Sequence, residues 1–168
     1  MLHCSSLSKL EETADRIGAR YMITLINEGT PVPQPASITS ENWLFLGFND
    51  IVTPIEGLKP PGQEHVEKLL GFVDQWPKDA PLLIHCWAGI SRSTAATFIT
   101  ACHLRPDLEE NALAARLRWA APSATPNRRL VELADAHLGR GGRMVEAIER
   151  IGRGADAFEG TPFEFDLD

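Results

Sequence analysis

Nine consecutive residues carry most of the chemistry that this sequence can perform: His85-Cys86-Trp87-Ala88-Gly89-Ile90-Ser91-Arg92-Ser93. A cysteine and an arginine stand six positions apart in this run, with a glycine between them. An ionised cysteine supplies a sulfur nucleophile, and a guanidinium can bind two phosphate oxygens at once. A thiolate at the floor of a phosphate-sized anion site indicates phosphoryl transfer through a cysteinyl-phosphate intermediate.

The residues on each side of the run indicate how such a site is built. The apolar run Pro81-Leu82-Leu83-Ile84 predicts a buried strand, and Thr94-Ala95-Ala96-Thr97-Phe98-Ile99 predicts a helix. A tight loop between them aims its amides and the positive end of the helix dipole at one point. The sequence therefore predicts an anion cradle that also stabilises a thiolate.

Each residue of the loop has a role in this interpretation. Cys86 attacks phosphorus in line, and Arg92 holds two of its oxygens. Gly89 lets the chain turn with a positive φ and keeps a side chain out of the cradle. Ser93 is placed to donate to the sulfur and help it leave, whereas His85 orients the loop. The phosphate-binding positions are Trp87, Ala88, Gly89, Ile90, Ser91 and Arg92.

The run resembles the His-Cys-x-x-Gly-x-x-Arg-Ser/Thr signature of the cysteine-dependent protein tyrosine phosphatase superfamily. The small size of the chain is similar to that of the dual-specificity and small bacterial members. This resemblance implies a mainly parallel sheet with helices on both faces, and catalysis without a metal or another cofactor. Outside the signature the resemblance is topological and covers roughly residues 1 to 138.

The resemblance also implies a general acid, an aspartate on a mobile loop that follows a strand upstream of the signature. Asp50 ends the strand-like run that starts at Trp43, and residues 53–62 after it are rich in turn formers that could carry the acid in and out. Glu56 is the alternative acid. Asp74 is a weaker one, because it falls within a helical pattern.

A second local match is Ala124-Thr125-Pro126-Asn127, which leads into a predicted helix. The resemblance implies that the Asn127 side chain braces the phosphate loop. Family members continue with a glycine and an aromatic residue, whereas this chain has Arg128-Arg129-Leu130. We therefore expect two cations near the mouth of the site.

The composition limits the remaining possibilities. A chain of 168 residues with 43% hydrophobic residues predicts one domain, which we place at residues 1–153, followed by an acidic tail at 154–168 that is either flexible or docked on arginine-rich helices. A net charge of −7 with few basic clusters argues against nucleic-acid binding, and no apolar run approaches the ~20 residues of a membrane span. Three cysteines without metal-ligand spacing, and no visible secretion signal, favour a reducing cytoplasm. The oligomeric state cannot be predicted.

Strand-like and helix-like segments alternate along the chain. Strands are expected at Met1–Cys4, Tyr21–Ile26 and the runs starting at Trp43 and Leu82; helices are expected at Leu7–Ile17, Gln63–Trp76, Ser91–His103, Leu108–Ala120, Asn127–Leu138 and Gly142–Ile151. Ser8 and Glu11 form a potential capping box for the first helix. The alternation predicts an α/β fold, with a mainly parallel sheet of about four or five strands and the site at the carboxyl ends of the strands.

The loop composition bears on the substrate. No lysine lies between Cys86 and Arg92, although phosphoinositide phosphatases of the superfamily tend to have one there. Trp87 offers an aromatic wall that suits an aryl or peptidyl ester. We therefore expect a protein tyrosine or dual-specificity phosphatase that acts on a phosphorylated protein or a small aryl phosphate. The alternatives are a catalytically silent phosphate-binding module and an enzyme similar to sulfur transferases or arsenate reductases.

Overall fold

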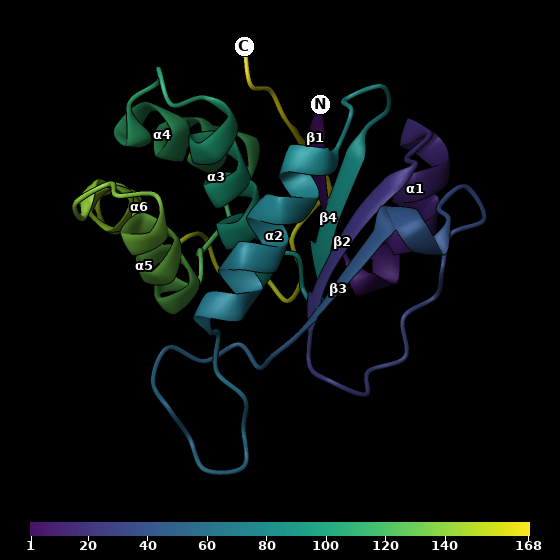
Figure 1. Cartoon of the computed structure of the whole chain (residues 1–168), viewed down its shortest axis with the longest axis horizontal. Coiled ribbons are helices and arrows are strands. Elements are labelled where there is room, and N and C mark those ends of the chain that lie inside the picture. Colours follow the sequence, from purple (N-terminus) through teal and green to yellow (C-terminus); the bar gives the residue numbers. More distant parts are fainter.

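A central sheet with helices on both faces organises the chain (Figure 1). The computed structural model describes residues 1–168. Its strands are β1 (Leu2–Ser6), β2 (Tyr21–Ile26), β3 (Trp43–Gly47), β4 (Leu82–Cys86) and β5 (Phe163–Phe165). Its helices are α1 (Leu10–Ile17), α2 (Gln63–Gln75), α3 (Arg92–Leu104), α4 (Glu110–Ala120), α5 (Arg128–His137) and α6 (Arg143–Ile151), with 3₁₀ turns η1 (Leu7–Lys9) and η2 (Ser40–Asn42).

The sheet has the strand order β3-β2-β4-β1-β5, and its first four strands are parallel. All residues of β4 are buried, as expected for a continuous apolar strand inside a sheet covered on both faces. The predicted fold class, a single α/β domain with a mainly parallel sheet of four or five strands, is confirmed.

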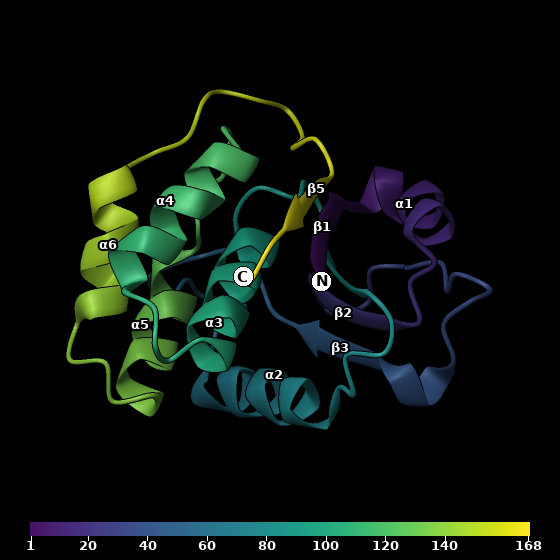
Figure 2. The same cartoon turned by 90° about the horizontal axis from the view of Figure 1, so that it is seen from above.

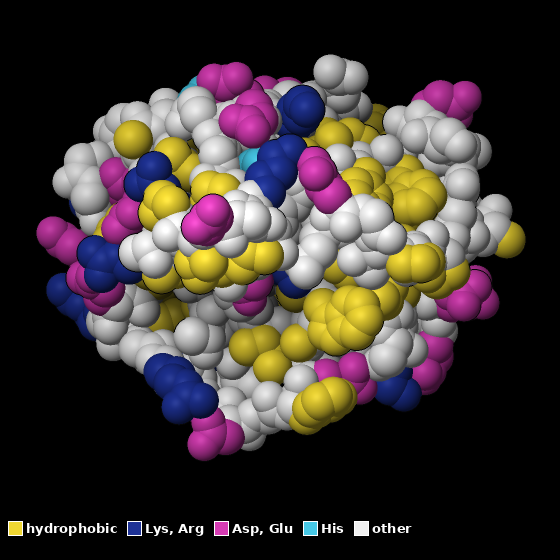
Figure 3. Space-filling view, turned by 90° about the horizontal axis from the view of Figure 1, so that it is seen from below, with side chains coloured by type: hydrophobic (Ala, Val, Ile, Leu, Met, Phe, Trp, Pro, Cys, Tyr) yellow, Lys and Arg dark blue, Asp and Glu magenta, His cyan; other side chains and the backbone are white.

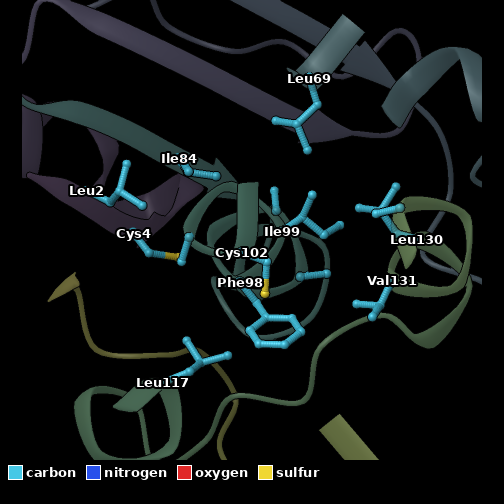
Figure 4. Packing of buried hydrophobic residues seen from close by; sticks show 14 of the residues in the cluster. Leu2, Cys4, Leu69, Ile84, Phe98, Ile99, Cys102, Leu117, Leu130 and Val131 are labelled. Carbon is cyan, nitrogen blue, oxygen red and sulfur yellow. The ribbon is translucent and has the colours of Figure 1, made fainter. Parts of the chain in front are cut away.

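The two faces of the sheet are covered unequally (Figure 2). One face carries α1 and a small buried cluster, which consists of Leu10, Ala14, Ala19, Met22, Ile38 and Leu83. The other face carries α2 to α6 and most of the core. Helix α3 is buried along nearly its whole length, and side chains from β1, β4 and the neighbouring helices surround it (Figure 4). The helix that follows β4 is thus the most enclosed helix of the molecule.

The first helix differs from its prediction. The chain forms η1 before α1, and neither element has a side-chain cap. The capping box that we expected from Ser8 and Glu11 is wrong, because the Ser8 hydroxyl donates to a Glu159 carboxylate oxygen at 2.5 Å instead. A contact between residues so far apart in the chain cannot be recognised in a local pattern.

The C-terminal segment forms a strand that the sequence did not reveal. Strand β5 pairs antiparallel with β1, and its residues are alternately buried and exposed. Arg116 donates to the Asp168 carbonyl at 2.7 Å, and Arg105 donates to the Leu167 carbonyl. In residues 154–168 the structure thus shows a strand paired with β1 and a chain end that accepts hydrogen bonds from Arg105 and Arg116. A strand of three residues is too short to give a recognisable period.

None of the helices combines the length and the apolar character needed to cross a membrane.

Candidate active site

The cysteine-containing loop lies where the carboxyl ends of the parallel strands meet. Residues 87–91 connect the end of β4 to the start of α3, and β1 and β2 flank β4 in the sheet. The segments that follow β2 and β3 contribute Asn27, Phe48 and Asp50 to the same place. This is the edge of an α/β sheet at which ligands bind.

Hydrogen bonds to the carbonyl groups of the loop hold its backbone in place. Donors from three distant segments bind them: Leu7 N to Trp87 O at 3.0 Å, Gly160 N to Ala88 O at 2.8 Å, and Thr125 N to Ile90 O at 2.9 Å. In a trans peptide the N–H points away from the C=O, so the amides of Ala88, Gly89 and Ser91 point to the opposite side. The Gly89 amide is 3.3 Å from the Cys86 sulfur. The loop therefore turns its amides towards the cysteine, as an anion cradle requires.

Cys86 is distinguished from the other cysteines by its surroundings. Its sulfur lies 3.1 Å from the Ser93 hydroxyl and beside the N-terminus of α3. Burial raises the pKa of Cys4 and of Cys102 to about 12, so both remain thiols. The Ser93 hydroxyl and the Gly89 amide are thus the two hydrogen-bonding groups next to the Cys86 sulfur.

Arg92 is shared between the scaffold and the cradle. The residue is only 5% exposed, and its Nη1 donates to Asn27 Oδ1 at 2.6 Å and to the Phe48 carbonyl at 2.8 Å. Its Nε is buried and has no acceptor in the protein. Because an unpaired buried donor of a charged group is costly, this atom points to an anionic ligand. Sequence analysis assigned no role to Asn27, although its place directly after β2 is a usable signal.

Gly89 is required by two separate constraints. Its φ is 69°, the positive value expected for the turn. A Cβ at this position would lie 2.9 Å from backbone atoms of Ser5 and Ser6 in β1. The expectation that a side chain here would fill the cradle is therefore wrong, because it would collide with the neighbouring strand.

His85 supports the loop from inside the sheet. Its Nε2 lies 2.7 Å from the Thr24 hydroxyl, which accepts from Trp43 Nε1 at 2.8 Å, and its Nδ1 lies 3.4 Å from the Cys86 carbonyl. Burial lowers the pKa of His85 to about 4, so the ring is neutral. Since a carbonyl can only accept, the proton belongs on Nδ1, and Thr24 donates to Nε2. Thr24 and Trp43 therefore orient the imidazole, a role that the sequence did not suggest.

Asp50 is the carboxylate that the structure brings to the loop. Its Oδ1 accepts from the Ser91 hydroxyl and from Asn127 Nδ2, both at 2.8 Å. Asn127 also caps α5 by accepting from the Leu130 amide at 3.0 Å. The Asn127 side chain thus ties α5 to the carboxylate. The backbone N–H of Asn127 donates to the Ser91 carbonyl of the loop at 3.2 Å.

The two alternative acids lie elsewhere. Glu56 is exposed and makes no hydrogen bond or ion pair. Asp74 lies on α2 and accepts from His103 Nε2 at 2.6 Å. Neither residue lines a hollow at the phosphate loop.

The segment after β3 is a closed loop that projects from the molecule (Figure 1). The Asn49 amide donates to the Lys59 carbonyl at 2.7 Å, and the Lys59 amide donates to Asn49 Oδ1 at 2.9 Å. Lys59 also pairs with Glu28 at 2.7 Å. Asp50 follows Asn49 and so lies beside the bonds that close the loop, rather than at its tip. Its carboxylate contacts Ser91 of the cradle.

Three hollows of about 590, 500 and 320 Å³ border the phosphate loop. The two cations that line the larger ones are already paired: Arg153 with Asp156 at 2.6 Å, and Arg128 with Glu132 at 2.8 Å and with Glu149. The expected Arg129 pairs with Glu132 at 3.5 Å and lines none of the three. Exposed hydrophobic side chains gather on this face of the molecule (Figure 3). Those that line the hollows are Val52, Ile55, Trp87 and Phe158. The mouth of the site is therefore largely apolar, with its cations neutralised.

No cluster of His, Cys, Asp or Glu side chains in the structure is arranged to hold a metal ion.

No protein-family model and no curated protein matches the sequence. Solved structures do match. Human DUSP28 is 20% identical over 83% of this chain and 94% of its own, with a TM-score of 0.60. PTP-2 phosphatase from Cydia pomonella is 15% identical over 80% of this chain and 84% of its own, with a TM-score of 0.64.

The chain has the fold of the dual-specificity and tyrosine phosphatases. A third structure with this phosphatase fold is the human tyrosine phosphatase-like serine/threonine/tyrosine-interacting protein. It is 16% identical over 83% of this chain and 92% of its own, with a TM-score of 0.63. At these identities the likeness concerns the fold, and activity has to be argued from the site.

Proposed function

We propose that the protein is a cysteine-dependent phosphomonoester hydrolase that acts on phosphorylated proteins. It acts either on phosphotyrosine alone or, with dual specificity, on phosphoserine and phosphothreonine as well. The observation that carries this proposal is the Arg92 guanidinium, whose buried Nε has no protein partner. It belongs to the same cradle as the Cys86 sulfur and the inward-pointing loop amides. A planar guanidinium, amide donors and a sulfur nucleophile together match a tetrahedral phosphate.

In the first step the Cys86 thiolate attacks phosphorus and the bond from phosphorus to the leaving oxygen breaks. Asp50 gives its proton to that oxygen, so the product alcohol or phenol leaves neutral. Ser91 and Asn127 both donate to Oδ1 of Asp50, which leaves Oδ2 to carry the proton. Arg92 and the loop amides hold the phosphoryl oxygens throughout.

In the second step a water molecule attacks phosphorus while Asp50 takes its proton. The bond between sulfur and phosphorus breaks, and its electron pair returns to Cys86 as a thiolate. The Ser93 hydroxyl, 3.1 Å from the sulfur, donates to it and stabilises this leaving group. The products are inorganic phosphate and the free enzyme, and no cofactor takes part in the proposed steps.

The surroundings of the cradle favour an aryl or peptidyl ester carrying one phosphate. Trp87 is 58% exposed and forms an aromatic wall next to Cys86. Arg128 and Arg153 already pair with carboxylates, so they offer no free charge to further phosphate groups. These features support a protein substrate rather than a polyphosphorylated inositol.

Hydrolysis of p-nitrophenyl phosphate in the presence of EDTA tests this function. We expect turnover by the wild type, loss of turnover in Cys86→Ser with retained phosphate binding, and near-normal turnover in the control Cys102→Ala. Cys102 is buried in α3 and makes no hydrogen bond to a residue of the cradle.

Equal turnover in Cys86→Ser would refute the cysteine mechanism. If neither the wild type nor any variant hydrolyses the ester or a phosphotyrosine peptide, while all of them bind phosphate, the protein is a phosphate-binding module instead.

A further inference from the structure

The C-terminal segment forms one wall of a hollow at the phosphate loop. Gly160 N donates to the Ala88 carbonyl at 2.8 Å, and the preceding residue, Glu159, accepts from Ser8. These bonds attach the segment to the loop that follows Cys86. The hollow that results has a volume of about 320 Å³ and is lined by Leu7, Ser8, Trp87, Ala88, Phe158 and Glu159.

The walls of this hollow are mainly apolar and aromatic. Trp87 is 58% exposed and Phe158 is 97% exposed, so both rings are accessible to a ligand. Leu7 and the Ala88 side chain complete the apolar lining. Exposed aromatic rings beside an anion cradle are surfaces on which a substrate side chain can pack.

One carboxylate interrupts the apolar lining. Oε2 of Glu159 accepts from the Ser8 hydroxyl at 2.5 Å. Hydrogen bonds from Ser8 and Ser6 lower the pKa of Glu159, so its side chain is ionised at neutral pH. Lys9 is the nearby cation, but it pairs with Glu12 at 3.4 Å. The Glu159 carboxylate is therefore left without a cationic partner.

An ionised carboxylate between aromatic walls is suited to a cation on a long aliphatic stem. The stem packs against the rings, and the charged end approaches the carboxylate and the ring faces. We propose that this hollow is a substrate subsite, and that it binds a lysine or arginine side chain located a few residues from the phosphorylated one. This inference rests on the proposed phosphatase function and specifies which phosphoproteins it acts on.

The subsite also complements the cradle. Arg92 and the loop amides attract the phosphate, whereas Glu159 attracts a positive charge on the neighbouring part of the substrate. A peptide with a phosphate and a nearby cation therefore meets opposite charges at both places. A peptide with acidic residues at that distance meets repulsion from Glu159, which discriminates between substrates.

Phosphotyrosine peptides that differ at one flanking position test the subsite. That position carries lysine, norleucine or glutamate, and is moved in turn along both sides of the phosphotyrosine. At one or more positions we expect kcat/KM for the lysine peptide to exceed that for the norleucine peptide by about three- to tenfold. The glutamate peptide is expected to be the poorest substrate.

Variants assign the preference to the hollow. Glu159→Gln keeps the acceptor for Ser8 and is expected to abolish the advantage of lysine over norleucine, with turnover of p-nitrophenyl phosphate unchanged. Phe158→Ala is expected to reduce the advantage and to act mainly on KM. Glu164→Gln removes the same charge from the exposed face of β5, outside the hollow, and is the matched control.

The outcomes separate this inference from the proposed function. Absence of hydrolysis of every ester by the wild type refutes the phosphatase function itself. Hydrolysis without a preference for lysine over norleucine at any position refutes the subsite alone. A lysine preference that survives in Glu159→Gln also refutes it, since the cation is then bound elsewhere.

Discussion

The nitrogen atoms of the Arg92 guanidinium have different partners: one bonds the scaffold of the site, and another is available to an anion. Nη1 bonds Asn27 and the Phe48 carbonyl, which fixes the plane of the group, and Nε is left for the ligand. Asp50 shows the same division, with Oδ1 held by Ser91 and Asn127. In both side chains one atom is fixed by the scaffold and another is free for chemistry, which is how a site is preorganised.

The proposed role of Asp50 as the acid leads to a prediction that depends on the leaving group. Asp50→Asn keeps the shape of the side chain but has no proton to give, so turnover of phosphotyrosine is expected to fall by about 10² or more. The loss on p-nitrophenyl phosphate is expected to be smaller, because p-nitrophenolate leaves readily without a proton. Steady-state kinetics with both substrates measure the two losses.

Glu56→Gln is the matched control, because Glu56 is the other carboxylate of the same loop. Near-normal kinetics are expected for it. If Glu56→Gln shows the dependence on the leaving group and Asp50→Asn does not, Glu56 is the acid.

At the level of elements, the phosphate loop depends on segments that come from both ends of the chain. The turn after β1 holds the Trp87 carbonyl, and the segment before β5 holds the Ala88 carbonyl. Each of these bonds fixes one peptide plane and so aims an amide into the cradle. The C-terminal segment therefore contributes to the geometry of the site as well as to the sheet.

Gly160 gives a test of that contribution. A Cβ on Gly160 would lie 2.7 Å from the Gly89 carbonyl oxygen, so Gly160→Ala must displace the loop or the segment. Small displacements of a catalytic group are costly, and we expect kcat to fall about ten- to a hundredfold. The measurement is turnover of p-nitrophenyl phosphate, with circular dichroism to confirm folding.

Gly71→Ala is the control, since Gly71 lies within α2 and a Cβ there meets nothing within 4 Å. It is expected to retain activity and to stabilise the protein by up to about 1 kcal/mol. Full activity in Gly160→Ala would show that the C-terminal segment does not position the loop.

Across the whole molecule, buried histidines link stability to pH. Burial lowers the pKa of His3 in β1, of His65 in α2 and of His85 in β4, the last to about 4. In the unfolded chain these rings take up protons near the ordinary value of 6.5, whereas in the folded protein they stay neutral to lower pH. Their contribution to stability is therefore complete above that value and is lost as the pH falls through the window between the two.

For His85 alone this loss amounts to about 2 kcal/mol of unfolding free energy between about pH 6.5 and about pH 5. We expect urea denaturation to show a decrease of at least this size in the wild type. The variant His85→Gln lacks the titrating ring, so its stability is expected to depend less steeply on pH over the same range. Identical slopes for the two proteins would contradict the assignment of a neutral, buried His85.

The sequence by itself determined the parts of the site that are local. Cys86 and Arg92 belong to one strand, loop and helix, and hydrophobic patterns and turn residues identify such a unit within a few residues. That Asp50 lies at this loop was predicted for a related reason. It follows a strand, and the carboxyl ends of parallel strands meet at one edge of the sheet.

Tertiary structure alone decided which distant groups complete that unit. Asn27 beside Arg92, the Trp43 and Thr24 side chains behind His85, and the bond of Gly160 to the loop all join segments far apart in the chain. A hydrogen bond between distant segments leaves no period in the sequence, because it depends on the packing of the sheet and its helices. For the same reason the short strand β5 and the hollow at Glu159 became visible only in the folded molecule.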